Sequence, residues 1–146
     1  METLKILSLY RELARVYDEI YGEGQRLKYW LISSQAGARV ADAGCGTGIA
    51  FEVLRDSYVV CLDISLDMLK LAARRARKHA LGDIVAGNYW QPPLRPRSFD
   101  SVLFISSLEP RLLDVAVEKW RGVARRLVCE FRGAWTVREL QQPKGY

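Results

Sequence analysis

The sequence contains little of what a metal centre or a disulfide-rich scaffold requires. It has one histidine and three cysteines in 146 residues. Cys45, Cys61 and Cys129 are odd in number and show no paired Cys-x-x-Cys spacing, so we expect them to be small reduced residues of the core. The composition therefore predicts neither a zinc site nor any other metal site, and no disulfides.

Long apolar runs are also missing. No run approaches the roughly 18 residues that span a membrane, and the charged start "METLKILSLYRELARVYDEIYG" lacks the apolar core and cleavage site of a secretory signal. We therefore predict a cytoplasmic protein with no membrane partner. A chain of this length forms one compact domain that buries roughly 70% of its unfolded surface.

Positive charge exceeds negative charge. The 22 Lys and Arg residues outnumber 17 Asp and Glu residues, which gives a net charge of +5. This excess permits contact with nucleic acid but does not require it.

The apolar pattern predicts an α/β domain preceded by helices. Residues 1–36 read as a helical extension in which "YGEG" separates two helices. Residues 37–133 alternate short apolar runs with helical patterns, which indicates a parallel sheet of about five strands covered on both faces. "WQPPLRPRS" must be a loop because of its prolines, and "TVRE" is read as the capping box of a short last helix within residues 134–146.

The stretch "RVADAGCGTGIAFEVL" places Gly44, Gly46 and Gly48 between a predicted strand and a predicted helix. Such a turn lets a ligand lie against bare backbone at a helix N-terminus, although a tight turn without a ligand would use the same residues. Asp63 ends the next strand, where an acidic side chain can accept both hydroxyl groups of a ribose. It could equally be only a turn former or a helix cap.

The spacing of the glycines argues against NAD. A dinucleotide turn reads G-x-G-x-x-G, whereas "GCGTG" spaces its glycines evenly, which disfavours a nicotinamide-dependent oxidoreductase. Asp42 lies two positions before the first glycine. A carboxylate there suits a cationic ammonium or sulfonium better than a pyrophosphate.

These motifs resemble those of the class I S-adenosylmethionine-dependent methyltransferases, especially the branch of ubiquinone and menaquinone biosynthesis enzymes. "VADAGCGTG" looks like the first motif of that family, "CLDISLDMLKLAARRA" like the second, and "DIVAGNYWQPPLRPRSFDSVLFISSLEP" follows the third and fourth. The resemblance covers about Arg39 to Phe131. It implies a Rossmann-like doubly wound sheet with strand order 3-2-1-4-5, S-adenosyl-L-methionine as cofactor, and methyl transfer as the activity.

The resemblance also implies a set of cofactor-binding residues. It places Asp42 and the backbone of Gly44, Cys45, Gly46 and Gly48 around the methionine part, Asp63 on the ribose, Ile64 and Met68 beside the adenine, Asn88 on the adenine amino group, and the main chain of Ser106 towards the sulfonium. Tyr89 either borders the adenine ring or packs under the proline loop.

Catalytic and acceptor residues are less defined by the sequence. Because the cofactor carries the reactive methyl group, a base is optional, and the candidates Glu109 and Ser106 could equally be cap or turn residues. Predicted acceptor contacts are Arg95, Arg97, Arg111 and Arg132, in loops expected at the carboxyl ends of the strands, and Tyr17 and Tyr21 in the N-terminal helices. These arginines suggest an anionic acceptor, such as RNA or a carboxylate or phosphate compound, but they could also be ordinary solvated loop residues.

The resemblance fails at the end of the chain. Family members commonly add two strands after the fifth, and this sequence lacks them unless "AWTV" forms a short strand. The fifth strand would then be an edge that the last helix, a homodimer or an activating partner covers. The sequence therefore predicts a methyltransferase whose acceptor is unidentified, with a non-catalytic subunit of a larger complex as the alternative.

Overall fold

A computed structural model describes residues 5, 9, 17–79 and 81–141, and of residues 17–20 only the backbone. Its centre is one six-stranded sheet with the order β3-β2-β1-β4-β5-β6. The strands are β1 Arg39–Ala43, β2 Tyr58–Asp63, β3 Gly82–Ala86, β4 Phe99–Ile105, β5 Ala124–Phe131 and β6 Ala134–Glu139. The first five strands are parallel and β6 runs antiparallel to β5, so the predicted order 3-2-1-4-5 is confirmed and a sixth strand is added.

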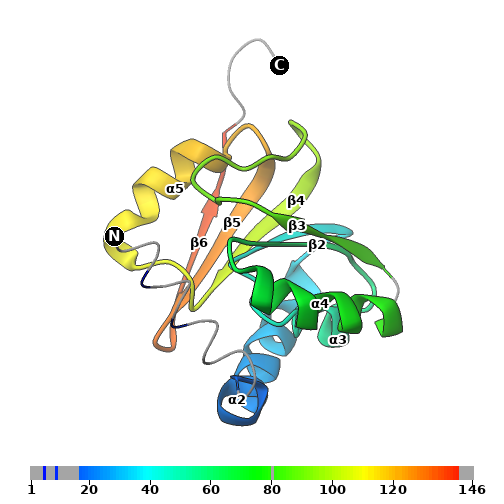
Figure 1. Cartoon of the computed structure of the whole chain (residues 1–146). Coiled ribbons are helices and arrows are strands. Elements are labelled where there is room, and N and C mark those ends of the chain that lie inside the picture. Colours follow the sequence, from blue (N-terminus) through cyan, green and yellow to red (C-terminus); the bar gives the residue numbers. More distant parts are fainter. Residues whose placement is uncertain (1–4, 6–8, 10–16, 80, 142–146) are drawn as a thin grey trace.

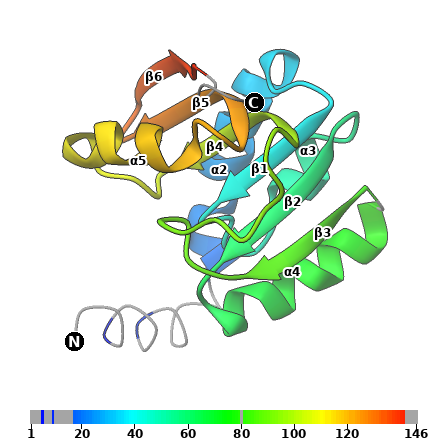
Figure 2. The same ribbon diagram turned by 90° about the horizontal axis from the view of Figure 1, so that it is seen from above.

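Helices cover both faces of the sheet (Figures 1 and 2). One face carries α2 (Tyr17–Ile32), the single-turn helix η1 (Ser33–Gln35), α3 (Ala50–Val53) and α4 (Leu66–His79). Tyr29 of α2, Phe51 of α3 and Leu69 of α4 share one buried cluster with β-strand residues such as Val40. The other face carries η2 (Pro110–Leu112) and α5 (Leu113–Trp120), and Trp120 is fully buried there.

No helix connects β3 to β4. The predicted proline loop is confirmed, and it crosses the face that α5 covers, because Tyr89, Trp90 and Leu94 pack against the same cluster as Trp120. The indole nitrogen of Trp120 donates a hydrogen bond to the backbone oxygen of Tyr89 at 2.9 Å. Aromatic side chains of a loop thus fill the space that a crossover helix occupies elsewhere in the fold.

The N-terminal prediction needs a correction. α2 continues through Tyr21–Gly24, so "YGEG" does not separate two helices. Each glycine in a helix costs about 1 kcal/mol relative to alanine, which packing against the sheet can offset, and Tyr29 and Ile32 of α2 are buried there. Most of the first predicted helix lies outside the described residues.

The C-terminal prediction of a short helix is wrong. Phe131 pairs with Ala134, and the two residues between them, Arg132 and Gly133, have φ angles of 51° and 84°. Two consecutive positive φ values form the tight hairpin turn whose twist matches that of paired strands. The sequence after it, "AWTVRE", is rich in aromatic and β-branched residues and pairs along β5. The edge of β5 is therefore covered by β6, and the two edge strands of the sheet are β3 and β6.

Within the part of the chain that the structure describes, no helix is long and apolar enough to cross a membrane. The same residues contain no group of three or more His, Cys, Asp and Glu side chains that could hold a metal ion.

Candidate functional site

Packing within the protein requires glycine at two positions of the turn between β1 and α3. Gly44 and Gly48 have φ angles of 75° and 78°. A Cβ atom at Gly44 would lie 2.7 Å from the Cβ of Ser107, and one at Gly48 would lie 2.9 Å from Ala72 of α4. A side chain at either position would therefore push apart the turn, α4 and the end of β4.

Asp63 at the end of β2 holds the glycine turn through backbone hydrogen bonds. Its carboxylate accepts from the N–H of Gly46 at 2.8 Å and from the N–H of Ser65 at 2.9 Å, and the residue is 5% exposed. Burial raises the pKa of Asp63 although these bonds oppose the shift. Ser65 in turn accepts from the N–H of Met68 and caps α4. Asp63 is thus paired within the protein at both carboxylate oxygens.

The predicted adenine contacts differ in what they can offer. Ile64 is exposed beside Asp63, whereas Met68 is only 1% exposed and presents no surface to a ring in this structure. The adenine contact of Met68 therefore stays a prediction. Asn88 is exposed, and its side-chain oxygen accepts from the N–H of Trp90 at 2.9 Å, which turns the start of the proline loop.

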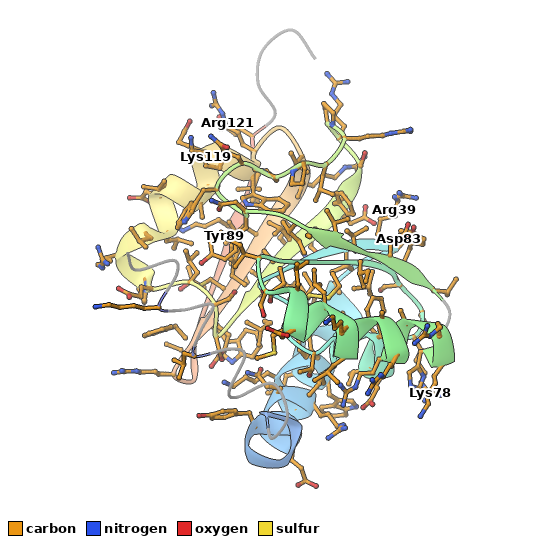
Figure 3. The ribbon with its side chains drawn as sticks, in the orientation of Figure 1. Arg39, Lys78, Asp83, Tyr89, Lys119 and Arg121 are labelled. Atoms are coloured by element: carbon orange, nitrogen blue, oxygen red, sulfur yellow. A yellow bond between two sulfur atoms is a disulfide. The ribbon has the colours of Figure 1, made fainter. Side chains whose placement is uncertain are left out.

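Tyr89 links the proline loop to the end of β4. Its hydroxyl donates to the backbone oxygen of Ser107 at 2.7 Å, and its ring packs edge-on against Phe104 and Trp90. Figure 3 shows Tyr89 towards the middle of the molecule, whereas Lys119 and Arg121 lie at its periphery. Packing under the proline loop, the second of the two interpretations of Tyr89, is observed.

Asp42 on β1 is fully buried and only half paired. One carboxylate oxygen accepts from the hydroxyl of Tyr29 on α2 at 2.7 Å, and the other has no hydrogen-bond partner. Burial raises the pKa of Asp42 to about 7, the Tyr29 hydrogen bond opposes this, and the charge of Asp63 adds to it. The side-chain oxygen of Gln25 is also buried without a partner.

A narrow pocket lies beneath α2 and beside the glycine turn. It has a volume of about 10 Å³, which is room for one water-sized group. The residues that line it are Gln25, Tyr29, Gly44, Cys45, Thr47, Ile49 and Ile105. Gln25 lines this pocket, and Asp42 is hydrogen-bonded to Tyr29 of the lining, so their unpaired oxygens suit a small cation such as an ammonium group.

A disulfide contradicts the prediction that all three cysteines are reduced. Cys45 in the glycine turn is bonded to Cys61 of β2, and their Cα atoms lie 5.3 Å apart. Parallel pairing of β1 with β2 brings together residues that are 16 positions apart, which the spacing in the sequence does not reveal. The bond joins the turn to the strand that carries Asp63. Cys129 is a free buried thiol, as expected.

The carboxyl ends of β4 and β5 carry a polar cluster that sequence reasoning found only in part. Ser106, with a φ of 58°, donates to a carboxylate oxygen of Glu130 at 2.8 Å, and Lys28 of α2 donates to Ser106 at 2.8 Å. Lys28 also lies 3.2 Å from Glu130, and the N–H of Gly133 donates to the other oxygen of Glu130 at 2.7 Å. Burial would raise the pKa of Glu130, but the hydrogen bonds from Gly133, Ser106 and Lys28 lower it.

Neither Lys28 nor Glu130 was predicted. Glu130 is fully buried, and the one signal in the sequence is a charged residue at the end of the apolar run "RLVCEF". Glu109, the predicted alternative, instead forms an exposed ion pair with Arg111 at 2.7 Å. The polar cluster at the carboxyl ends of β4 and β5 therefore contains Ser106 and Glu130 but not Glu109.

The four predicted arginines do not gather around one crevice. The N–H of Arg97 donates to the backbone oxygen of Gly122, which precedes β5, so Arg97 lies at the amino ends of the strands and its prediction is wrong. Exposed Arg95 belongs to the same returning loop. Arg111 follows β4, and Arg132 follows β5 with its guanidinium 5.4 Å from the ring centre of Phe131. Only these two follow the carboxyl ends.

The two predicted tyrosines belong to α2. Tyr21 is exposed on this helix, and the side chain of Tyr17 lies outside the described residues. Cover of an acceptor by these rings stays a prediction.

A larger groove lies at the opposite end of the parallel strands, where they begin. Its volume is about 430 Å³, and it is lined by Gln35, Gly37, Ala38, Asp100, Arg125, Arg126 and Glu139. These residues precede or begin β1, β4 and β5, apart from Glu139 at the end of antiparallel β6. Open parallel sheets bind ligands at the carboxyl ends of their strands, so the pocket beneath α2 is the better candidate despite its size.

Comparison with known proteins agrees with the fold and the motifs. Residues 41–126, more than half of the chain, match the family described as a methyltransferase domain. The chain is 33% identical over 132 residues to the 18S rRNA (guanine-N(7))-methyltransferase of Bos taurus. This match covers 88% of this chain and 45% of that protein. It is also 34% identical over 110 residues to the ubiquinone/menaquinone biosynthesis C-methyltransferase UbiE of Rhizobium leguminosarum. That match covers 66% of this chain and 43% of that protein.

Solved structures show the same fold. The crystal structure of geranyl diphosphate C-methyltransferase from Streptomyces coelicolor, in complex with Mg²⁺, geranyl diphosphate and S-adenosyl-L-homocysteine, has a TM-score of 0.62 and 19% identity. The match covers 74% of this chain and 45% of that chain. The chain thus spans less than half the length of these relatives.

Proposed function

Because the chain belongs to the S-adenosylmethionine-dependent methyltransferase family and its cofactor is S-adenosyl-L-methionine, we propose that it transfers the cofactor's methyl group to an acceptor with an anionic group. The observation that carries the proposal is the unpaired buried oxygen of Asp42 beside the glycine turn. The amino-acid end of the cofactor offers an ammonium group, which can donate to that oxygen.

The remaining cofactor contacts follow the carboxyl ends of β1 and β2. Each oxygen of Asp63 already accepts one N–H, yet a carboxylate oxygen can accept a second hydrogen bond, which leaves capacity for the ribose hydroxyl groups. Exposed Ile64 supplies apolar surface next to it for the adenine. When bound, the cofactor supplies the activated methyl group, and the chain has to orient the acceptor and exclude water.

We place the acceptor at the ends of β4 and β5. Ile105 lines the pocket beneath α2, and the next residue, Ser106, belongs to the cluster with Lys28 and Glu130. The ammonium group of Lys28 provides a positive charge for an anionic group of the acceptor. Glu130 accepts three hydrogen bonds and its pKa is lowered, so it stays ionised and fixes Lys28 and Ser106 rather than acting as a proton acceptor.

RNA is the first acceptor class to test. The net charge of +5 favours a polyanion, and the bovine relative is named for methylation of guanine in ribosomal RNA. The relative from Rhizobium leguminosarum is named for quinone biosynthesis, so small aromatic compounds are the second class.

A non-catalytic subunit is the second candidate, favoured by the free edge of β6. Trp135 and Val137 of this strand are 37% and 45% exposed. An apolar edge strand is a natural pairing site for another chain. The partner surface would then be β6, not β5 as the sequence suggested.

The test is calorimetric titration of the purified protein with S-adenosylmethionine and S-adenosylhomocysteine, with NAD as a control. Micromolar binding of the first two alone is the expected result. A tritiated-methyl assay against RNA, protein and metabolite pools then follows. Absence of labelling in all three pools, despite binding of the cofactor, would favour the subunit.

A further inference from the structure

Two oxygens stand out among the described residues, because they are the buried side-chain atoms without a hydrogen-bond partner: one oxygen of Asp42 and the amide oxygen of Gln25. A buried acceptor that lacks a donor is unfavourable, so such atoms in a folded protein call for a donor from water or from a ligand. Asp42 belongs to the glycine motif, whereas Gln25 lies on α2, which precedes that motif.

Tyr29 links both residues to the same pocket. Gln25 precedes Tyr29 by four residues, so both side chains lie on one face of α2. Both line the pocket of about 10 Å³, and Tyr29 donates to the paired oxygen of Asp42. Gln25 therefore reaches the pocket from the helix, and Asp42 of the sheet is joined to the lining of the pocket through Tyr29.

Two ion pairs, made by residues that follow Gln25 closely on α2, fix this helix over the pocket. Arg26 pairs with Glu52 of α3 at 2.9 Å, and Lys28 lies 3.2 Å from Glu130 of β5. Because these contacts reach α3 on one side and β5 on the other, the helix is held in place before any ligand binds. Gln25 is thus positioned without a contribution from the cofactor.

We propose that Gln25 and Asp42 together bind the primary ammonium group of the cofactor's amino-acid end, which makes α2 part of the cofactor site. An ammonium group is about the size of a water molecule and carries three N–H donors, so it can satisfy both oxygens at once. A hydroxyl group has one donor and would leave one oxygen unpaired. This inference rests on the proposed function, because it assumes that S-adenosylmethionine is bound.

The experiment compares three ligands by calorimetry: S-adenosylhomocysteine, its deaminated analogue S-adenosyl-4-thiobutyric acid, and 5′-methylthioadenosine, which lacks the amino-acid end. The wild-type protein should bind the deaminated analogue at least tenfold more weakly than S-adenosylhomocysteine. Gln25→Leu should weaken S-adenosylhomocysteine about tenfold and leave the other two ligands unchanged. Gln35→Leu is the matched control, because Gln35 is exposed at the opposite end of the parallel strands, and it should change none of the three affinities.

Each result bears on the proposal. Equal affinity of the wild-type protein for the amino and deaminated ligands would overturn it, and this arm needs no variant. Unchanged binding by Gln25→Leu would assign the oxygen to a buried water, and equal weakening of all three ligands would assign Gln25 a structural role only; both overturn the proposal. If the wild-type protein binds neither S-adenosylhomocysteine nor methylthioadenosine, the proposed function itself fails.

Discussion

Asp63 and Asp42 are both buried carboxylates at neighbouring strands, yet the protein treats them differently. Both oxygens of Asp63 accept hydrogen bonds from backbone N–H groups, whereas one oxygen of Asp42 is paired and the other is not. Asp63 therefore holds the turn in shape whether or not a ligand is present. Asp42 keeps binding capacity for a ligand. In the proposed site, the adenosine half is therefore built from satisfied groups, and the amino-acid half is not.

Asp63→Ala should have the largest effect. It leaves the N–H groups of Gly46 and Ser65 without their acceptor, at about 1–3 kcal/mol each, and it also removes the proposed ribose contact. Calorimetry should show losses of more than about 100-fold for both S-adenosylhomocysteine and methylthioadenosine. Thermal unfolding should shift to lower temperature. Unchanged affinity would refute the ribose assignment, and unchanged stability would refute the role in the turn.

Removal of the disulfide should loosen both halves at once, because Cys45 lines the pocket and Cys61 precedes Asp63 by two residues. Closure of a loop of this length stabilises a fold by about 3 kcal/mol. Urea unfolding should therefore show a loss of that size on addition of a reductant. Cys61→Ala should be equally destabilised and insensitive to the reductant, and Cys129→Ala should keep the wild-type response. A wild-type protein that is insensitive to reductants would contradict the bond.

Asp42→Asn should separate the two halves. It retains an oxygen for the Tyr29 hydroxyl but removes the negative charge, so S-adenosylhomocysteine should bind about 30-fold more weakly, equivalent to about 2 kcal/mol. Methylthioadenosine has no ammonium group and should bind as it does to the wild-type protein. A parallel loss for both ligands would show that the difference between the two carboxylates does not hold.

The pKa of Asp42, raised to about 7 by burial, gives the smallest effect on binding, and its sign is defined. Its contribution to stability is full below the unfolded value near 4 and is lost as the pH rises through 7, with a slope of up to about 1.4 kcal/mol per pH unit. Binding of S-adenosylhomocysteine should change in the opposite sense and strengthen several-fold between pH 6 and pH 8. Both trends, measured by urea unfolding and calorimetry, should be absent in Asp42→Asn. A wild-type profile identical to that of the variant would contradict the shift.

The sheet could be predicted because its signals are local. Apolar runs, the even spacing of the glycines and the position of Asp63 define β1, β2 and the turn between them without knowledge of distant residues. The hairpin at Arg132 and Gly133 was also readable, since a glycine turn between "LVCEF" and "AWTV" is a hairpin signal. The apparent capping box "TVRE" led to a helix instead, and pairing with β5 overrode it.

Other parts of the site depend on contacts between distant segments. Cys45 with Cys61, Tyr29 with Asp42, and Lys28 with Glu130 are each brought together by the fold rather than by a pattern of neighbours. The position of Arg97 also depends on the fold. Because no helix connects β3 to β4, the proline loop itself returns to the amino ends of the strands and carries Arg97 there. The sequence correctly predicted a loop for this segment, but the prediction that Arg97 lies at the carboxyl ends of the strands was wrong.

The hairpin between β5 and β6 also determines when the proposed acceptor region can form during synthesis. Glu130 receives one hydrogen bond from Lys28, in an early helix, and another from Gly133, in the last turn of the described chain. A nascent chain that has emerged only as far as Phe131 would contain this carboxylate without one of its donors, and a buried charge without its donors is strongly unfavourable. The carboxyl ends of β4 and β5 therefore become a finished surface only after the hairpin turn at Gly133 has been made. Premature termination before Gly133 would yield a chain with most of its fold and an unsettled acceptor side.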